Sequence, residues 1–179
     1  DLRPGATGVG YDRAVNEDTR VARLIEAARK AGATLRGPAI PCGPGDDAAV
    51  LSPPAGRELA WTTDSLLEGV HFRRSWASWH DVGRKAIGAA LSDLAAMGAE
   101  PLGALISLVL PLQLEVEHGE TLMAGAGMKL AELGCPLVGG NVSLGTERVE
   151  ISVSALGAVD VGAALRRSGG QTGDALFVS

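Results

Sequence analysis

The sequence is poor in aromatic residues, in cysteine and in positive charge, and it lacks a long apolar run. Phe, Trp and Tyr make up 3% of its 179 residues, so backbone groups and small side chains must shape much of any binding site. A net charge of −5 gives no general attraction for nucleic acid or for an anionic membrane. No apolar run approaches the roughly 20 residues that span a bilayer. We therefore expect a soluble protein without nucleic-acid or membrane partners, which needs cations if it binds a polyanion.

Common cysteine and nucleotide motifs are also absent. Cys42 and Cys135 are far apart in the sequence and form no metal-type cluster, which favours a reducing, cytoplasmic location. The chain has no Gly-x-x-x-x-Gly-Lys-Ser/Thr motif, and the two glycines in residues 125–127 lack the third glycine of a dinucleotide-binding loop. These absences disfavour P-loop kinases and Rossmann oxidoreductases.

The residues that are present predict a packed domain with three helices. Apolar residues make up 46% of the chain, which is enough for a hydrophobic core. Apolar side chains recur at helical spacing in residues 18–30, 79–97 and 115–133. Gly32 and Gly134 are expected to end the first and the last of these helices.

Strands alternate with the predicted helices. The pattern predicts strands at 58–63, 102–110 and 149–155, a short strand at the apolar end of 46–51, and an extended piece at 70–72. Residues 149–155 alternate between apolar and polar side chains, as in a strand with one covered face. The order of elements favours the α+β class, with a mixed β-sheet covered by helices on one face.

One carboxylate stands out because it lies alone in an apolar helix. Asp93 is the only charged residue between Ala86 and Glu100, and its helical position points it toward the buried side or its margin. An unpaired carboxylate is costly in such a place. Asp93 is therefore either a structural acid bonded to a neighbouring turn or a metal ligand.

Further oxygen ligands occur where a loop or strand meets the predicted sheet. Asp46 and Asp47 are adjacent, and Thr62-Thr63-Asp64 adds two hydroxyls and an acid at the expected end of a strand. Such hard oxygen ligands suit Mg²⁺, which is commonly coordinated by substrate phosphates as well. Together with Asp93 they form a candidate metal site only if the fold gathers them.

Two other segments offer weaker signals. Gly139-Gly140-Asn141 is either a turn before a strand or a place where backbone amides approach a ligand. His71 either binds a phosphate or packs beside Phe72.

Three segments resemble successive motifs of the thiamine-monophosphate kinase family, in order and in spacing. They are 45–51 (GDDAAVL), 62–72 (TTDSLLEGVHF) and 91–99 (LSDLAAMGA). This family belongs to the superfamily of aminoimidazole ribonucleotide synthetase, whose members bind ATP without a P-loop. The resemblance covers about residues 18–179, where 166–169 and 173–174 resemble the passage into a second domain.

The resemblance implies a set of ligand positions, with no side chain acting as a catalytic acid or base. His71 matches a contact to thiamine phosphate, and the ATP contacts match Gly140, Asn141 and Arg167. The magnesium positions are Asp46, Asp47, Thr62, Thr63, Asp64 and Asp93, with Asp46 beside the other ligands. Asn141 stands where the family often has Asp, so we expect one metal site to be weaker.

By this resemblance, the expected function is ATP-dependent phosphorylation of thiamine monophosphate to thiamine diphosphate, with Mg²⁺ and ATP bound in a homodimer whose sheets pair. Residues 1–17 are expected to be a mobile leader, 18–160 the ATP- and magnesium-binding domain, and 161–179 a linker with the first strand of a truncated second domain. The 179 residues alone are expected to be inactive. Two alternatives remain. The chain belongs either to another ATP-dependent enzyme of the superfamily with a different acceptor, of the purine-biosynthetic formylglycinamidine ribonucleotide synthase type, or to a noncatalytic nucleotide-binding dimerisation module.

Overall fold

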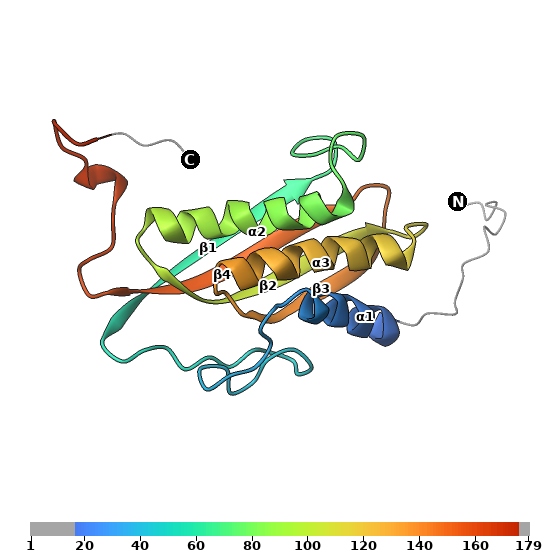
Figure 1. Cartoon of the computed structure of the whole chain (residues 1–179), viewed down its shortest axis with the longest axis horizontal. Coiled ribbons are helices and arrows are strands. Elements are labelled where there is room, and N and C mark those ends of the chain that lie inside the picture. Colours follow the sequence, from blue (N-terminus) through green and yellow to red (C-terminus); the bar gives the residue numbers. More distant parts are fainter. Residues whose placement is uncertain (1–16, 176–179) are drawn as a thin grey trace, which may run out of the picture.

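The computed structural model describes residues 17–175. The expected leader lies outside these residues except for Glu17, as do residues 176–179 of the expected last strand. The elements labelled in Figure 1 follow in this order: α1 (Glu17–Lys30), β1 (Arg57–Leu67), α2 (Trp79–Ala96), β2 (Glu100–Pro111), α3 (Val116–Glu132), β3 (Leu137–Thr146) and β4 (Glu150–Asp160). A short 3₁₀ helix (Arg167–Gly169) comes after β4.

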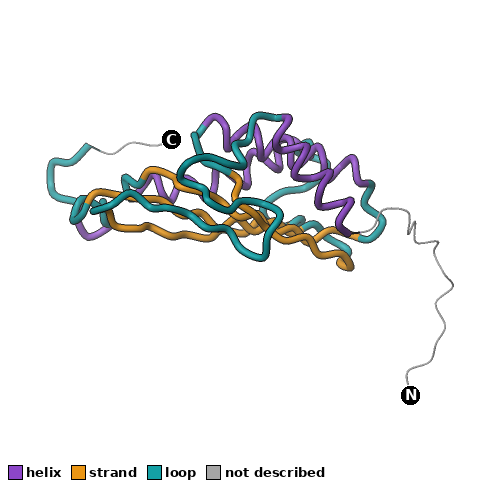
Figure 2. Tube along the Cα trace, turned by 90° about the horizontal axis from the view of Figure 1, so that it is seen from below, coloured by secondary structure: helices purple, strands orange, loops and turns teal. Residues whose placement is uncertain are grey.

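The four strands form one mixed sheet in the order β1-β4-β2-β3. β4 pairs antiparallel with both β1 and β2, whereas β2 and β3 run parallel. β1 and β3 are therefore the two edges. The helices lie on one side of this sheet (Figure 2), which confirms the predicted α+β class with helices on one face.

Strand alternation explains why one face is covered and the other is open. In β4, Ile151, Val153 and Ala155 are buried beneath the helices, while Ser152 and Ser154 lie on the opposite face. A strand points successive side chains to opposite faces, so the apolar half of the sequence meets the helices. The open face carries small and polar residues together with exposed apolar side chains such as Trp61 and Leu105.

The three helices pack side by side through apolar stripes. The buried residues of α2 include Val82, Ala86 and Ala90, at the spacing of one helix face, and the side chain of Ser78 caps its first turn by accepting from the Asp81 N–H. α1 ends at Lys30, and Gly32 turns the chain after it with a φ of 105° that is easily reached only by glycine. No helix in residues 17–175 combines the length and apolarity that crossing a membrane requires.

Close contact between the helices depends on glycines in α2 and α3. A Cβ at Gly125 would lie 2.0 Å from the His80 carbonyl oxygen, and one at Gly83 would lie 2.0 Å from that of Leu122. On the other side of α3, a Cβ at Gly127 would meet the Ala28 oxygen of α1 at 2.4 Å. The two glycines of residues 125–127 thus serve helix packing.

Four local predictions need correction. Residues 46–51 form no strand, and only an isolated bridge joins Cys42 to Val50. Within 70–72, Val70 and His71 lie in a turn, and Phe72 makes only an isolated bridge with Glu68. β1 continues to Leu67, so Thr62-Thr63-Asp64 lies within the strand, where pairing with β4 extends the ladder. Likewise, residues 139–141 lie within β3 because they pair with β2.

Replacement of Gly125 by Ala should destabilise the fold by about 1–3 kcal/mol, because the new methyl group would force α2 and α3 apart. Gly88→Ala, also in a helix, is the matched control: its Cβ would meet only the Lys129 Cε at 4.0 Å, and we expect about 0.5–1 kcal/mol of added stability. Urea denaturation measures both. Equal effects of the two changes would contradict the packing role of Gly125.

Candidate functional site

A hydrogen bond between Thr62 and Asp93 joins two of the predicted site segments. The Thr62 hydroxyl, in the middle of β1, donates to Asp93 Oδ2 over 2.7 Å. Asp93 lies near the end of α2 and is exposed to solvent, yet it bonds to a residue of the sheet. It therefore occupies the margin of the helix face that packs on the sheet. Tertiary structure thereby brings together two oxygen ligands that are far apart in the sequence.

Alternation along β1 divides the Thr62-Thr63-Asp64 motif between the two faces of the sheet. Asp64 shares the face of Thr62, toward the helices, and its Oδ1 accepts from the Ser65 N–H over 2.7 Å. Thr63 points to the open face. The motif therefore offers one hydroxyl and one acid on the helix side, and a second hydroxyl on the other side.

The open face holds a cavity of about 580 Å³ that reaches from β1 across the sheet to β3. Thr63 lines it from one edge, and Gly140 and Asn141 line it from the other. Asn141 Nδ2 donates to Ser143 Oγ over 3.0 Å. The volume lies within the range of small-molecule sites. The remaining lining includes Trp61, Leu105, Ser107, Ser152, Ser154 and Leu156.

Asp46 and Asp47 border the same cavity from the loop that precedes β1. Asp46 Oδ1 accepts from the Asp47 N–H over 2.8 Å, and Asp46 Oδ2 lies 3.7 Å from the Cys42 sulfur. Both acids also line a second cavity, of about 470 Å³, between α1 and β3, together with Gly140 and Asn141. This pair of acids therefore lies with β3, at the edge opposite β1.

The predicted convergence of Asp46, Asp47, Asp64 and Asp93 is not formed. In the described part of the chain no three His, Cys, Asp or Glu side chains are grouped so that they could hold a metal ion together. The reason is the order of the strands: β1 and β3 are separated by two other strands, or about 14 Å. Asp93 and Asp64 belong to the β1 edge, and the two loop acids belong to the β3 edge.

The residues present nevertheless fit Mg²⁺, because this ion commonly uses one or two protein carboxylates and completes its shell with water and substrate phosphates. Asp93 Oδ2 and Thr62 Oγ1 are hard oxygen ligands that lie 2.7 Å apart. No sulfur or imidazole ligand belongs to this pair. Each of the two acid groups therefore carries oxygen atoms of the kind that Mg²⁺ takes as ligands.

His71 lies in the turn that follows β1. Its Nδ1 accepts from the Leu67 N–H over 3.0 Å, and its carbonyl oxygen accepts from Lys85 Nζ over 2.6 Å. The ring is exposed, while Phe72 is buried beside it. The structure thus separates the two predicted roles: Phe72 does the packing, and the His71 ring faces solvent.

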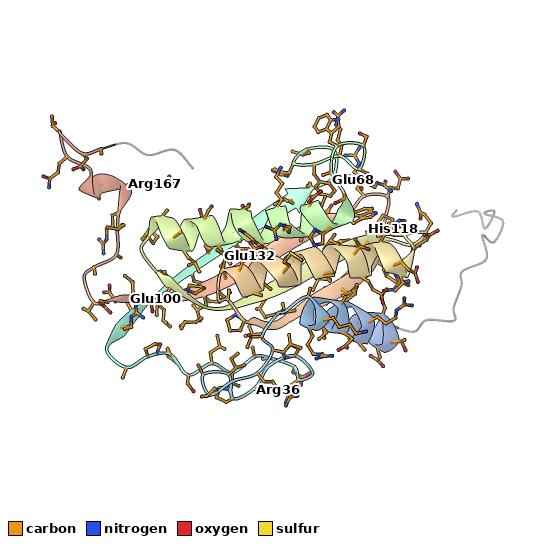
Figure 3. All side chains as sticks on the ribbon, viewed as in Figure 1. Arg36, Glu68, Glu100, His118, Glu132 and Arg167 are labelled. Atoms are coloured by element: carbon orange, nitrogen blue, oxygen red, sulfur yellow. The ribbon has the colours of Figure 1, made fainter. Side chains whose placement is uncertain are left out.

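Arg167 is not brought to the other site residues. It opens the short 3₁₀ helix in the exposed arm beyond β4. Figure 3 shows Arg167 on that arm, well apart from Glu68, which precedes the His71 turn. Its assignment as an ATP contact thus has no support from neighbouring residues within 17–175.

Sequence reasoning missed several residues that border the site. Trp61 and Ser154 line the open-face cavity, where Trp61 Nε1 donates to Ser154 Oγ over 2.7 Å. The alternating serines of β4 were the available signal. Lys85 was also missed, and its contact with the His71 carbonyl could not be inferred before the turn was placed against α2.

Comparison with known proteins gives consistent results. The family model described as AIR synthase related protein, N-terminal domain, matches residues 45–159. A thiamine-monophosphate kinase of Synechococcus elongatus is 41% identical over 130 residues, covering 73% of this chain and 39% of that protein. The crystal structure of thiamine-monophosphate kinase from Stenotrophomonas maltophilia K279a has a TM-score of 0.70 and 37% identity, covering 81% of this chain and 44% of that one.

A further similar structure contains ligands. It is AaThiL complexed with AMPPCP and TMP, with a TM-score of 0.57 and 36% identity, covering 83% of this chain and 43% of that one. The chain thus spans less than half the length of these relatives.

The position of Asp46 can be tested through Cys42. Burial raises the pKa of the Cys42 thiol, and the negative charge of Asp46 raises this pKa further. We expect Asp46→Asn to speed maleimide labelling of Cys42 near pH 8, because more thiolate is present. Asp47→Asn is the control and should change the rate less. Cys135, whose pKa burial raises to about 12, should stay unlabelled in the folded chain. An unchanged rate in Asp46→Asn would contradict this placement.

Proposed function

We propose that this chain, which belongs to the family of AIR synthase related proteins as an N-terminal domain, binds ATP and metal. It would do so in an enzyme that phosphorylates thiamine monophosphate to thiamine diphosphate. The match confirms the resemblance drawn from the three motif segments. The observation that carries the proposal is the 2.7 Å contact between Thr62 and Asp93, which joins two of those segments at one point of the fold. Relatives that match 73% and 87% of this chain are named thiamine-monophosphate kinase.

The proposed reaction needs little from side-chain acids or bases. The acceptor phosphate is largely ionised near neutral pH, so one of its oxygens can attack the γ-phosphorus of ATP directly. ATP and the acceptor bring about six negative charges together, and their repulsion is the main obstacle. The chain must therefore place the two substrates in line and offset this charge.

Magnesium ions, when bound, would supply that positive charge. On this chain, Asp93 and Thr62 would hold one ion with Asp64 on the same face, and Asp46 and Asp47 would hold another from the β3 edge. Thr63 faces the cavity between them. Because the two acid groups lie at opposite edges, the phosphates of ATP would have to bridge the open space between them.

Gly140 and Asn141 are the proposed nucleotide contacts on this chain. They line both cavities beside the two loop acids. A Cβ at position 140 would lie 1.9 Å from the Ile106 carbonyl oxygen, so glycine is required there by the backbone of β2. Asn141 keeps a carbonyl oxygen for a cation but lacks the charge of Asp. Arg167 completes the proposed contacts only if the exposed arm moves or a second copy supplies it.

The division of the parent protein follows from the same proposal. Residues 18–160 would form the ATP- and magnesium-binding domain, and 161–179 would lead into a second domain that fixes the acceptor. Both cysteines in this chain are free, which agrees with a cytoplasmic location. The purine-biosynthetic alternative with another acceptor has no observation in its favour among the relatives compared.

A homodimer is proposed through the open face of the sheet. The apolar side chains of residues 149–155 are not available for such a contact, because they lie beneath the helices. The open face instead exposes Leu59, Trp61 and Leu105, of which Trp61 is 76% exposed. An uncovered apolar group on a sheet face favours a self-complementary twofold contact.

We expect a dimer in sedimentation equilibrium at micromolar concentration. Trp61→Glu should shift the chain to monomer, because a charge would be buried at the twofold contact. Trp76→Glu is the matched control, since Trp76 is 73% exposed but lies in the turn before α2, and it should leave the dimer intact. A wild-type monomer, or equal effects of the two variants, would overturn the proposed interface.

The proposed activity is tested by magnesium-dependent formation of thiamine diphosphate from ATP and thiamine monophosphate. The two-domain protein should form this product, and the 179 residues alone should be at least about a hundredfold slower, because misplacement by about an ångström has such an effect. Equal rates would place the catalytic boundary elsewhere. Transfer to a different acceptor only would contradict the proposed substrate.

Asp93→Asn supplies the variant arm of this test. Asn keeps an oxygen that accepts from Thr62, so the urea midpoint should hardly change, whereas binding of Mg-ATP should weaken by about tenfold or more. Glu147→Gln removes a charge from an exposed turn and controls for net charge. Equal losses of stability and of Mg-ATP binding in Asp93→Asn would favour a structural acid.

A further inference from the structure

The segment that follows β4 is fastened to the rest of the domain at two points. The Gly162 N–H donates to Glu58 Oε2 of β1 over 3.1 Å, and the Leu165 N–H donates to the Met97 carbonyl oxygen at the end of α2 over 3.1 Å. Between these points Ala164 packs against the hydrophobic core. Residues 161–165, which we call the strap, are therefore held by both the sheet and the helix layer.

An ion-pair cluster fixes the corner of the sheet from which the strap leaves. Arg57 Nη1 of β1 lies 2.6 Å from Glu100 Oε2 of β2, and Arg57 Nε lies 3.1 Å from Asp160 Oδ1 of β4. The Ala163 N–H donates to the Asp160 carbonyl oxygen over 2.9 Å, which turns the chain after the end of β4. The start of the strap is thus tied to three strands.

The second anchor of the strap completes the end of α2. The Ala99 N–H donates to the Leu94 carbonyl oxygen over 2.9 Å, and Gly98 has a φ of 70°. These are the marks of a Schellman motif, after which carbonyl groups of the last helical turn still need partners. The Leu165 N–H supplies one for Met97. The strap therefore caps the carbonyl end of α2.

The Leu165 side chain covers the same turn. Its Cγ and Cδ1 lie 3.6 Å from the point that a Cβ at Gly98 would occupy, so the side chain rests on the glycine backbone. Leu165 is nevertheless 61% exposed. It therefore holds the strap on the turn and contributes little to the hydrophobic core.

One residue joins the strap to the candidate site. Met97 accepts from Leu165 through its carbonyl oxygen, and its own N–H donates to the Asp93 carbonyl oxygen over 3.1 Å. The Asp93 carboxylate in turn accepts from the Thr62 hydroxyl over 2.7 Å. A continuous series of hydrogen bonds therefore runs from the strap through the last turn of α2 to β1.

Beyond the strap the described chain has no such fastening. Residues 166–175 are exposed and make hydrogen bonds only among themselves. Two adjacent glycines, at 169–170, add backbone freedom. Figure 1 shows this part of the arm standing away from the helices and the sheet. The change from a fastened to an unfastened chain falls directly after Leu165.

We propose that the strap locks the last turn of α2 and that the chain pivots directly beyond Leu165, so that movement of the arm is transmitted through Met97 to Asp93. Leu165 is the positioning residue: a seated strap keeps the Asp93 carboxylate on Thr62, and a released strap lets the end of α2 open. The expected domain boundary at residue 160 would then move to 165. Only the meaning of Asp93 as a metal ligand rests on the proposed function.

The seat of the strap is tested by amide hydrogen exchange on this chain without ligand. The Leu165 amide should exchange at least about tenfold more slowly than the amides of Arg166 and Arg167. Leu165→Ala should speed exchange at position 165 and at Met97 by about threefold or more, and Leu165→Met should preserve the wild-type rates. Val161→Ala is the matched control, because Val161 is 68% exposed in the same strap, and it should change neither rate.

Two results would overturn the strap. One is a wild-type Leu165 amide that exchanges as fast as that of Arg167. The other is an equal effect of Leu165→Ala and Val161→Ala on exchange at Met97.

Transmission to Asp93 is read from the methyl signals of two adjacent threonines in β1. Thr62 bonds to Asp93, whereas Thr63 points to the open face and is the control within each spectrum. Asp93→Ala defines the Thr62 signal without the bond. Leu165→Ala should move the Thr62 signal part of the way toward that reference and leave the Thr63 signal in place. An unmoved Thr62 signal in Leu165→Ala would overturn the transmission.

Binding of Mg-ATP to the two-domain protein separates this proposal from the proposed function. Leu165→Ala should weaken binding by about threefold or more, and Leu165→Met should weaken it less. If wild-type protein binds Mg-ATP and Leu165→Ala binds it equally well, the effect of the strap on the site is overturned and the proposed function stands. If wild-type protein binds no Mg-ATP while the exchange and methyl results hold, the proposed function fails and the strap stands.

Discussion

Coverage of the sheet by helices on one face only is the constraint on which the rest of the structure depends. It assigns every strand residue to a helix side or an open side, because side chains alternate along a strand. The buried apolar residues of β4 meet the helices, and the open side of the sheet lines a cavity of about 580 Å³ with both polar and apolar side chains. The same rule divides Thr62 and Asp64 from Thr63.

The helix layer is held close by small residues, and this closeness sets the positions of the site. Gly83 and Gly125 allow the backbones of α2 and α3 to lie so close that a Cβ at either position would clash with a carbonyl oxygen of the other helix. α2 also packs on the β1 edge, where Asp93 accepts from Thr62. The packing of α2 on β1 thus places the carboxylate of one motif within hydrogen-bond distance of the hydroxyl of another.

α2 links the two ends of the proposed reaction. Near its end it carries Asp93, the proposed metal ligand, and earlier it carries Lys85, which donates to the carbonyl oxygen of His71. The loop acids and Gly140 approach from β3, on the opposite edge. Substrate phosphates would therefore lie between two groups of side chains. The fold positions each group separately, and the bound phosphates would bridge them.

The sequence by itself determined the three long helices, the positions of β1, β2 and β4, the α+β class and the family, because periodicity and motif order are local properties of the chain. It could not place strand ends, so Thr62-Thr63-Asp64 and Gly140 proved to lie within strands, where pairing with neighbours decides. Only the tertiary structure showed that Asp93 meets Thr62, that the loop acids lie at the other edge, and that Lys85 and Leu67 fix His71. Strand order and helix packing set those distances, and both arise from contacts between residues far apart in the sequence.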